Sequence, residues 1–149
     1  PIADFESFFS IFNTYLKLRN GQELHFELGR SIVGTIGNLI SKVLYIKEGA
    51  SKNFAILDAG MTELIRPALY NSKHKIENLS KHANLPNSFY DVVGPICESS
   101  DCFGAEINLP ATSRGDIIAI RCAGAYGEVM ASNYNLREKP LAVYSRNSN

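Results

Sequence analysis

Apolar side chains recur at three- and four-residue spacing near the start of the chain. Residues 4–18 carry six of them on one broad stripe: Phe5, Phe8, Phe9, Phe12, Tyr15 and Leu16. This spacing is typical of an amphipathic helix, with Asp4 suited to its N-cap and Asn20-Gly21 to its end. We expect the aromatic stripe to pack on a large apolar surface, either in the rest of this chain or in a domain outside it.

Residues 24–28 alternate between apolar and polar side chains and run into Gly29-Arg30. The alternation predicts a short strand. A helix followed by a strand with a polar end is typical of an α/β barrel, in which functional groups lie at the carboxyl ends of strands. We therefore interpret this helix and strand as the tail of a βα-type repeat.

After Arg30 the pattern changes to stretches rich in Ile, Val, Leu and Ala, separated by clusters of Gly, Asn, Lys and Ser. Four such stretches predict strands, at residues 31–47, 54–58, 91–96 and 116–123. Short helical segments are expected at residues 61–69 and near 130–134, a loop with or without a preceding strand at 73–87, and a frayed end at 145–149. The prediction for residues 31–149 is a mainly β domain, a sandwich or distorted barrel.

The composition fits one soluble globular domain, with 149 residues, 45% hydrophobic and 20% charged. Fifteen basic and fifteen acidic side chains cancel, so no bulk field favours nucleic acid or a membrane surface. No apolar run approaches the roughly 20 residues that cross a bilayer, and we expect no secretory leader. Because the chain starts at Pro1 rather than Met, we expect a segment of a longer protein.

Cysteine and histidine spacing argues against a disulfide framework or a metal site. Three cysteines without a CxxC pair, Cys97, Cys102 and Cys122, predict reduced thiols in a cytoplasmic protein. The latter two are assigned to packing. The three histidines, His25, His74 and His82, share no ligand spacing, so strand, loop and surface roles are expected and no metal.

Four clusters place polar or flexible residues where a plain β domain needs none: residues 27–30, 58–61 followed by 66–70, 94–101 and 124–127. Each alone has a simple structural explanation. Gly29 and Gly60 can provide turns with positive φ, Arg66 and Glu98 can be surface charges, and Tyr126 can be a core aromatic beside a bend. The residues by themselves do not specify a reaction.

Taken together and in this order, the clusters form longer motifs. They are FAILDAGMTELIRPALY at residues 54–70, DVVGPICESSD at 91–101, and GAYG at 124–127 leading to SNYN at 132–135. Over essentially all 149 residues, the chain resembles the C-terminal part of the diaminopimelate decarboxylases, in the family of pyridoxal-phosphate decarboxylases built from an α/β barrel and a β-domain. The resemblance implies that residues 1–30 are the terminal helix and strand of a truncated α/β barrel and that residues 31–149 are the C-terminal β-domain. One departure is Leu28, where the family usually has proline, which can loosen that turn.

The resemblance implies pyridoxal phosphate as the cofactor and assigns four residues to it. Glu27 matches the acid beside the pyridine nitrogen, where a carboxylate favours the protonated ring. Gly29 and Arg30 match part of the phosphate cradle, and Tyr126 matches the tyrosine that hydrogen-bonds the phosphate. The lysine that forms the Schiff base would precede Pro1, so we expect the isolated chain to be inactive and to hold no cofactor.

The resemblance also assigns the substrate site. Arg30, Arg66 and Tyr70 match residues that bind the carboxylate diaminopimelate retains, and guanidinium groups suit this task because they present paired donors. Arg66 and Tyr70 lie four apart on an expected helical turn, so both can face one ligand. Tyr126 is included in this substrate set, and Glu98 matches the acid that pairs with the retained ammonium.

Cys97 matches a cysteine near the reacting carbon and is the candidate catalytic proton donor. Asp101 is expected to orient the loop rather than to react. In this family the cysteine and the acid after it, here Cys97 and Glu98, reach the active site of the opposite subunit. The resemblance therefore implies a homodimer with shared sites.

The implied reaction of the full-length enzyme converts meso-2,6-diaminopimelate to L-lysine and carbon dioxide. A decarboxylase of ornithine, arginine or a carboxylated polyamine is the alternative within the family. Those substrates lack a second carboxylate. The paired Arg30 and Arg66 with Tyr70 therefore argue against them. The non-enzymatic alternative is a catalytically silent dimerisation or structural module. A free-standing binding protein is the third alternative.

Overall fold

A computed structural model describes residues 4–80 and 85–145 of the chain. In chain order its helices and strands are α1 (Phe5–Tyr15), α2 (Arg30–Val33), β1 (Asn38–Glu48), β2 (Asn53–Leu57), α3 (Arg66–Tyr70), β3 (Ile76–Asn78), β4 (Asn87–Val93), β5 (Cys102–Pro110), β6 (Ile117–Arg121) and the 3₁₀ helix η1 (Tyr134–Leu136). In the described ranges, no helix has the length and apolar character to span a bilayer.

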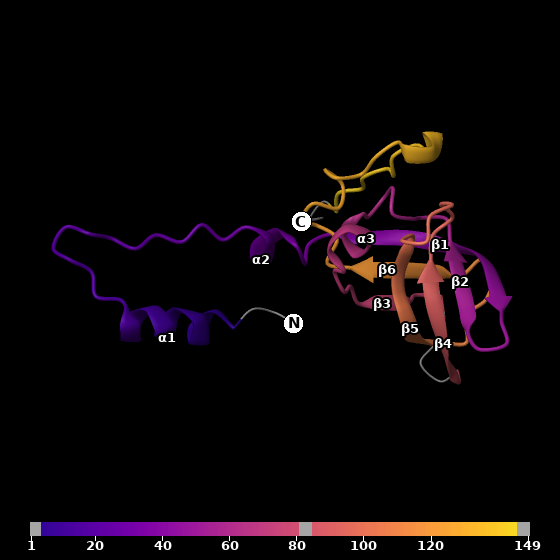
Figure 1. Cartoon of the computed structure of the whole chain (residues 1–149), viewed down its shortest axis with the longest axis horizontal. Helices are drawn as coiled ribbons and strands as arrows, with labels where there is room; N and C mark the ends of the chain where they lie inside the picture. Colours follow the sequence, from indigo (N-terminus) through magenta and orange to yellow (C-terminus); the bar gives the residue numbers. More distant parts are fainter. Residues whose placement is uncertain (1–3, 81–84, 146–149) are drawn as a thin grey trace.

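The strands form one six-stranded sheet in the order β3-β6-β1-β2-β4-β5. All neighbours are antiparallel except β2 and β4. The sheet curls so far that its two edge strands meet: a methyl group on Gly104 of β5 would lie 3.6 Å from Ile76 Cδ1 of β3. This barrel-like arrangement (Figure 1) confirms the prediction of a mainly β domain and gives it a distorted barrel rather than a sandwich.

Alternating strand residues fill the barrel interior, as the pleat requires. Val43 of β1, Ala55 and Leu57 of β2, Val92 of β4 and Ile118 and Ile120 of β6 are all fully buried. Burying each larger aliphatic side chain contributes about 1.5–3 kcal/mol. These residues hold the scaffold on which the loops of the site are mounted.

One buried carboxylate joins two strands and the turn between β1 and β2 at the barrel wall. Asp91 of β4, 5% exposed, forms an ion pair with Lys52 and accepts a 2.9 Å hydrogen bond from the Glu106 amide of β5. Burial raises the pKa of Asp91, but the hydrogen bonds and the charge of Lys52 outweigh it, so the pKa lies below its usual value. The ionised form is therefore the one that stabilises the fold.

We predict that Asp91→Asn lowers the free energy of unfolding at pH 7 by about 1–3 kcal/mol, because the amide would turn a donor toward Lys52. The pKa of Asp91 is lower in the folded protein than in the unfolded chain, where it is about 4. Its contribution to stability is therefore fully present above the unfolded pKa and is lost as the pH falls through the folded pKa. In urea denaturation, the free energy of unfolding of the variant should therefore be well below that of the wild type at pH 7, and the difference should be smaller at pH 3. Equal unfolding midpoints of wild type and variant at pH 7 would contradict the prediction.

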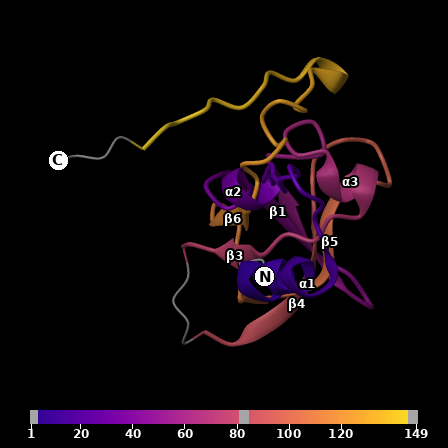
Figure 2. The same ribbon diagram turned by 90° about the vertical axis from the view of Figure 1, so that its left-hand side faces the viewer.

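The N-terminal arm, residues 4–33, extends away from the barrel in Figure 1, and in the turned view of Figure 2 α1 lies in front of the strands. Its predicted helix is present as α1, and Asp4 caps it by accepting a 3.1 Å hydrogen bond from the Ser7 amide. The aromatic stripe packs in part on the segment that follows it, since the Phe26 ring lies 4.7 Å from Phe9 and 5.0 Å from Phe12. Phe8, however, stays half-exposed.

The strand predicted at residues 24–28 is wrong for this chain, because the segment is extended but pairs with no described strand. A strand requires a neighbour for its backbone hydrogen bonds, and the alternating pattern alone supplies none. The division at residues 30 and 31 into a barrel remnant and a β-domain stays a prediction.

Other predicted boundaries shift. The strand predicted from residue 31 begins at Asn38, after the short helix α2, and only the end of the segment predicted as helix at 61–69 is helical, in α3. The segment near 130–134 gives turns and then η1, and residues 73–87 include β3. β5 was not predicted. The fraying predicted for 145–149 falls mostly on residues outside the described ranges.

Candidate active site

A buried arginine lies against two tyrosines at the start of α3. Arg66 is only 8% exposed, and its guanidinium carbon lies 5.1 Å from the ring centroid of Tyr70 and 5.5 Å from that of Tyr126. The single turn of α3 places residues 66 and 70 on one face, as the four-residue spacing predicts. The structure thus brings together three predicted site residues from two distant parts of the sequence.

The Arg66 guanidinium makes no hydrogen bond or ion pair with any residue in the described ranges. The tyrosine rings contribute cation–π attraction, but a ring face does not satisfy the N–H donors of the guanidinium. A buried cation normally has an anionic partner, because desolvation of the charge is costly. The arrangement is therefore suited to an anionic ligand such as a carboxylate or phosphate.

Tyr126 is held in a tight turn against the end of α2. Its φ is +67°, and a methyl group on Gly124 would lie 2.1 Å from the Val33 carbonyl oxygen, while one on Gly127 would lie 2.3 Å from the Ala123 oxygen. Only glycine fits such close backbone approaches. The Tyr126 ring is 51% exposed, and its hydroxyl makes no hydrogen bond in the described part of the chain, so it is available to a ligand.

Cys97 and Glu98 lie in the loop between β4 and β5, and both are exposed. The Glu98 carboxylate accepts a 2.6 Å hydrogen bond from the hydroxyl of Tyr134 in η1. This hydrogen bond, followed by the negative charge of Glu98, raises the pKa of Tyr134, so the phenol is protonated at neutral pH. Neither Cys97 nor Glu98 contacts the Arg66 guanidinium in the structure.

Asp101 anchors the loop that carries Cys97 and Glu98. Its buried carboxylate accepts hydrogen bonds from the backbone amides of Met61, at 2.6 Å, and Ile96, at 2.7 Å. Burial raises the pKa of Asp101, and the two amides partly oppose that rise. Asp101 therefore joins the loop to the segment before Arg66, in agreement with the expected orienting role.

Two glycines make room for this carboxylate. A methyl group on Gly60 would lie 2.9 Å from both oxygens of Asp101, and one on Gly94 would lie 2.4 and 2.5 Å from them. The interpretation of Gly60 as a residue with positive φ is wrong, since the described glycines with positive φ are Gly21 and Gly115. Close packing on Asp101 is what excludes a side chain at Gly60. Gly29 also lacks a positive φ, at −103°.

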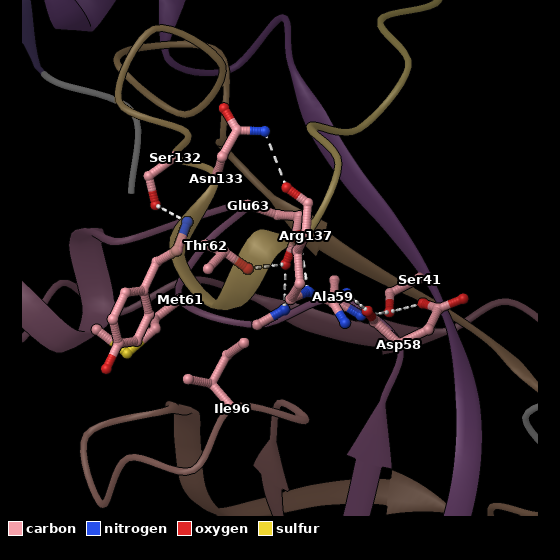
Figure 3. Close-up of polar contacts among 12 residues, drawn as sticks. Ser41, Asp58, Ala59, Met61, Thr62, Glu63, Ile96, Ser132, Asn133 and Arg137 are labelled. Atoms are coloured by element: carbon pink, nitrogen blue, oxygen red, sulfur yellow. Dashed lines mark hydrogen bonds and ion pairs between the residues drawn. The ribbon is translucent and has the colours of Figure 1, made fainter.

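A second set of polar contacts fixes the segment that carries η1 (Figure 3). Arg137 donates to Glu63 Oε1 at 3.3 Å and also to the Asp58 carbonyl oxygen. Glu63 Oε2 in turn accepts from the Gly60 amide at 2.6 Å and the Thr62 hydroxyl at 2.8 Å. Sequence reasoning missed Glu63 and Arg137, since nothing in their local pattern pairs residues 74 positions apart.

The remaining predicted site residues lie in the N-terminal arm. Glu27, Gly29 and Arg30 are exposed, and no hydrogen bond, ion pair or ring contact joins Glu27 or Arg30 to the Arg66 cluster in the described ranges. The arm therefore supplies these side chains without placing them in the cluster. Their roles stay predictions.

The other cysteines and histidines have structural surroundings. Cys102 begins β5 and is half-buried, but Cys122 is exposed, so its assignment to packing is wrong. Its φ of +61° turns the chain after β6. His74 Nδ1 bonds the Arg121 carbonyl oxygen at 2.8 Å and His25 pairs with Glu23, while His82 lies outside the described residues.

Comparisons with known proteins agree with the motifs. Residues 11–124 match the family model described as pyridoxal-dependent decarboxylase, C-terminal sheet domain. The diaminopimelate decarboxylase of Bacteroides thetaiotaomicron is 62% identical over 144 residues, 97% of this chain and 37% of that protein. The chain thus spans about a third of the length of this curated relative.

Solved structures show the same relationship. The crystal structure of diaminopimelate decarboxylase from Helicobacter pylori complexed with L-lysine matches with a TM-score of 0.70 and 50% identity, over 76% of this chain and 27% of that one. The enzyme from M. jannaschi matches with a TM-score of 0.72 and 44% identity, over 75% of this chain and 25% of that one. With a family model that covers most of its length and relatives this similar, the chain belongs to the pyridoxal-dependent decarboxylases and comprises their C-terminal sheet domain.

Proposed function

We propose that this chain is the C-terminal part of a decarboxylase that converts meso-2,6-diaminopimelate to L-lysine and carbon dioxide with pyridoxal phosphate. The observation that carries the proposal is the Arg66 guanidinium, buried beside two tyrosines and without an anionic partner in the described ranges. The names of the most similar relatives support the same substrate.

Diaminopimelate is an amino acid at both ends, and only one end loses its carboxylate. The retained carboxylate needs a cation with paired donors, which a guanidinium provides better than an ammonium. Arg66 and Tyr70 would bind it, with Tyr126 beside them and Arg30 added from the N-terminal arm. Ornithine, arginine and carboxylated polyamines have no second carboxylate and would leave Arg66 unpaired.

The residues present fit the cofactor as well. Pyridoxal phosphate, when bound, accepts the electron pair that departing carbon dioxide leaves behind. The unbonded Tyr126 hydroxyl would donate to the phosphate, and Gly29 and the backbone at Arg30 would complete part of its cradle. Glu27 would hold a proton on the pyridine nitrogen by its negative charge.

Cys97 would return a proton to the reacting carbon, and Glu98 would bind the retained ammonium. We further infer that both act across the interface of a homodimer, since both are exposed on a loop and neither has a hydrogen bond or ion pair with Arg66 in the described ranges. A cytoplasmic location, predicted from the cysteines, belongs to the same proposal.

Turnover by the complete protein with pyridoxal phosphate tests the function. Carbon dioxide release should be rapid with meso-diaminopimelate and at least about 100-fold slower, in kcat/KM, with L-ornithine and L-arginine, because each leaves the buried guanidinium unpaired. Equal or better turnover of ornithine would assign the chain to the alternative decarboxylase.

The isolated 149-residue chain provides the corresponding negative control. We predict that it releases no carbon dioxide and shows no absorption band of bound cofactor when pyridoxal phosphate is added, because no lysine matches the Schiff-base position. Measurable turnover would contradict this expectation. Its absence, together with activity of the complete protein, would identify the chain as a domain that is silent by itself.

A further inference from the structure

Tyr134 and Glu98 are joined across 36 positions of sequence by the 2.6 Å hydrogen bond between phenol and carboxylate. We propose that Tyr134 is a positioning residue that orients the Glu98 carboxylate toward the ammonium group of the substrate. This inference rests on the proposed function and deepens it, because it adds a specificity-determining residue to the ammonium end of the site.

The segment that carries Tyr134 is fixed at both of its ends to residues 58–63. At one end the Ser132 amide donates to the Thr62 carbonyl oxygen at 2.9 Å. At the other, Arg137 binds Glu63 and the Asp58 carbonyl oxygen. Figure 3 shows Ser132, Asn133 and Arg137 lying over Thr62 and Glu63.

Further contacts stiffen the turn between these ends. Asn133 Nδ2 donates to the Arg137 carbonyl oxygen at 2.9 Å, which closes the segment on itself. Asn135 and Leu136 adopt left-handed φ values of 55° and 58°. Such conformations persist when surrounding contacts hold them, so the position of Tyr134 is set by this frame.

The Glu98 loop is anchored to the same frame. Asp101 binds the Met61 amide, so residues 58–63 support Tyr134 on one side and Glu98 on the other. The scaffold therefore sets the separation of the two residues. Their hydrogen bond then selects one orientation of an otherwise exposed glutamate side chain.

A phenol suits this task better than a cation would. Tyr134 is neutral, so the hydrogen bond leaves the negative charge of Glu98 in place to attract an ammonium group. It uses one of the roughly four acceptor positions of the carboxylate, and the others remain for the ligand. An arginine or lysine in the same place would neutralise Glu98 and compete with the substrate.

The test is Tyr134→Phe in the complete protein with pyridoxal phosphate. KM for meso-diaminopimelate should rise by about 10-fold, the size expected when a ligand must order one flexible side chain, while kcat and cofactor affinity change little. With 2-aminopimelate, which keeps the distal carboxylate but lacks the distal amine, the variant and the wild type should have the same KM.

A matched control and a double variant make the result specific. Tyr144→Phe removes another phenol near a glutamate, 3.5 Å from Glu128, and should change no kinetic constant. Glu98→Gln should raise KM for diaminopimelate more than for 2-aminopimelate. In that background Tyr134→Phe should have no further effect, because the group it orients is gone.

Additive effects of the two substitutions, or an equal rise in KM for both substrates, would overturn the positioning role. An unchanged KM in Tyr134→Phe alongside normal wild-type turnover would also overturn it, with the proposed function intact. Wild-type protein that does not decarboxylate diaminopimelate at all would overturn both. Circular dichroism of each variant shows whether it is folded.

Discussion

Arg66→Met in the complete protein is expected to lower kcat/KM for meso-diaminopimelate by about 100-fold. The substitution removes the guanidinium that lies against Tyr70 and Tyr126 and leaves a carboxylate of the substrate without its charged partner. Hydrogen bonds to charged groups are worth about 1.5–3 kcal/mol, and each 1.4 kcal/mol corresponds to about tenfold in affinity. Steady-state kinetics of purified variant and wild type measure the change.

The same substitution should not destabilise the protein, because a buried cation without a described anionic partner costs free energy in the unliganded state. Urea denaturation should therefore show an unfolding midpoint at or above that of the wild type. Arg66→Lys is the matched control, because it keeps the charge but loses the paired donors. Its kcat/KM should lie between that of the wild type and that of Arg66→Met. Full activity of Arg66→Met would contradict the assignment of the carboxylate site.

Asp101→Asn is expected to lower the free energy of unfolding by about 1–3 kcal/mol and also to reduce activity. Both oxygens of Asp101 accept a backbone amide, from Met61 and from Ile96. An asparagine has one acceptor oxygen, so one of these buried amides would face an NH₂ group and remain unsatisfied. The loop with Cys97 and Glu98 would lose either its internal hydrogen bond from Ile96 or its hydrogen bond from Met61 in the segment before Arg66.

Urea denaturation measures the first effect and steady-state kinetics the second. Glu106→Gln makes the same carboxylate-to-amide change at an exposed position of β5 and should alter neither quantity. If Asp101→Asn and Glu106→Gln behave alike, Asp101 does not hold the loop.

The parts of the fold that could be predicted are those whose pattern is local. The three- and four-residue spacing of aromatic side chains located α1, and runs of branched apolar residues located most of β2 and all of β6. β5 was missed because Gly104, Asn108 and Pro110 interrupt it and because irregularities in its pairing with β4 break the alternation. The strand predicted at residues 24–28 failed for the opposite reason, since its local pattern was good and no described neighbour pairs with it.

In the candidate site, too, only the local relationships could be predicted from the sequence. Arg66 and Tyr70 could be paired from sequence because one helical turn separates them. Three other contacts join residues far apart in the chain: the ring contact of Tyr126 with Arg66, the hydrogen bond from the Met61 amide to Asp101, and the hydrogen bond from Tyr134 to Glu98. Such contacts depend on how the barrel closes, which no short pattern encodes.

Arg137 links the proposed orientation of Glu98 to a segment that contributes no buried residue in the described ranges. The buried residues in the described ranges end at Ala131, whereas Tyr134 and Arg137 follow it. Proteolysis between these two regions would leave an intact barrel interior while releasing the frame around Glu98. If Tyr134 orients Glu98 as proposed, substitutions after Ala131 that keep Arg137 paired with Glu63 can alter recognition of the amine while the buried strand residues stay the same.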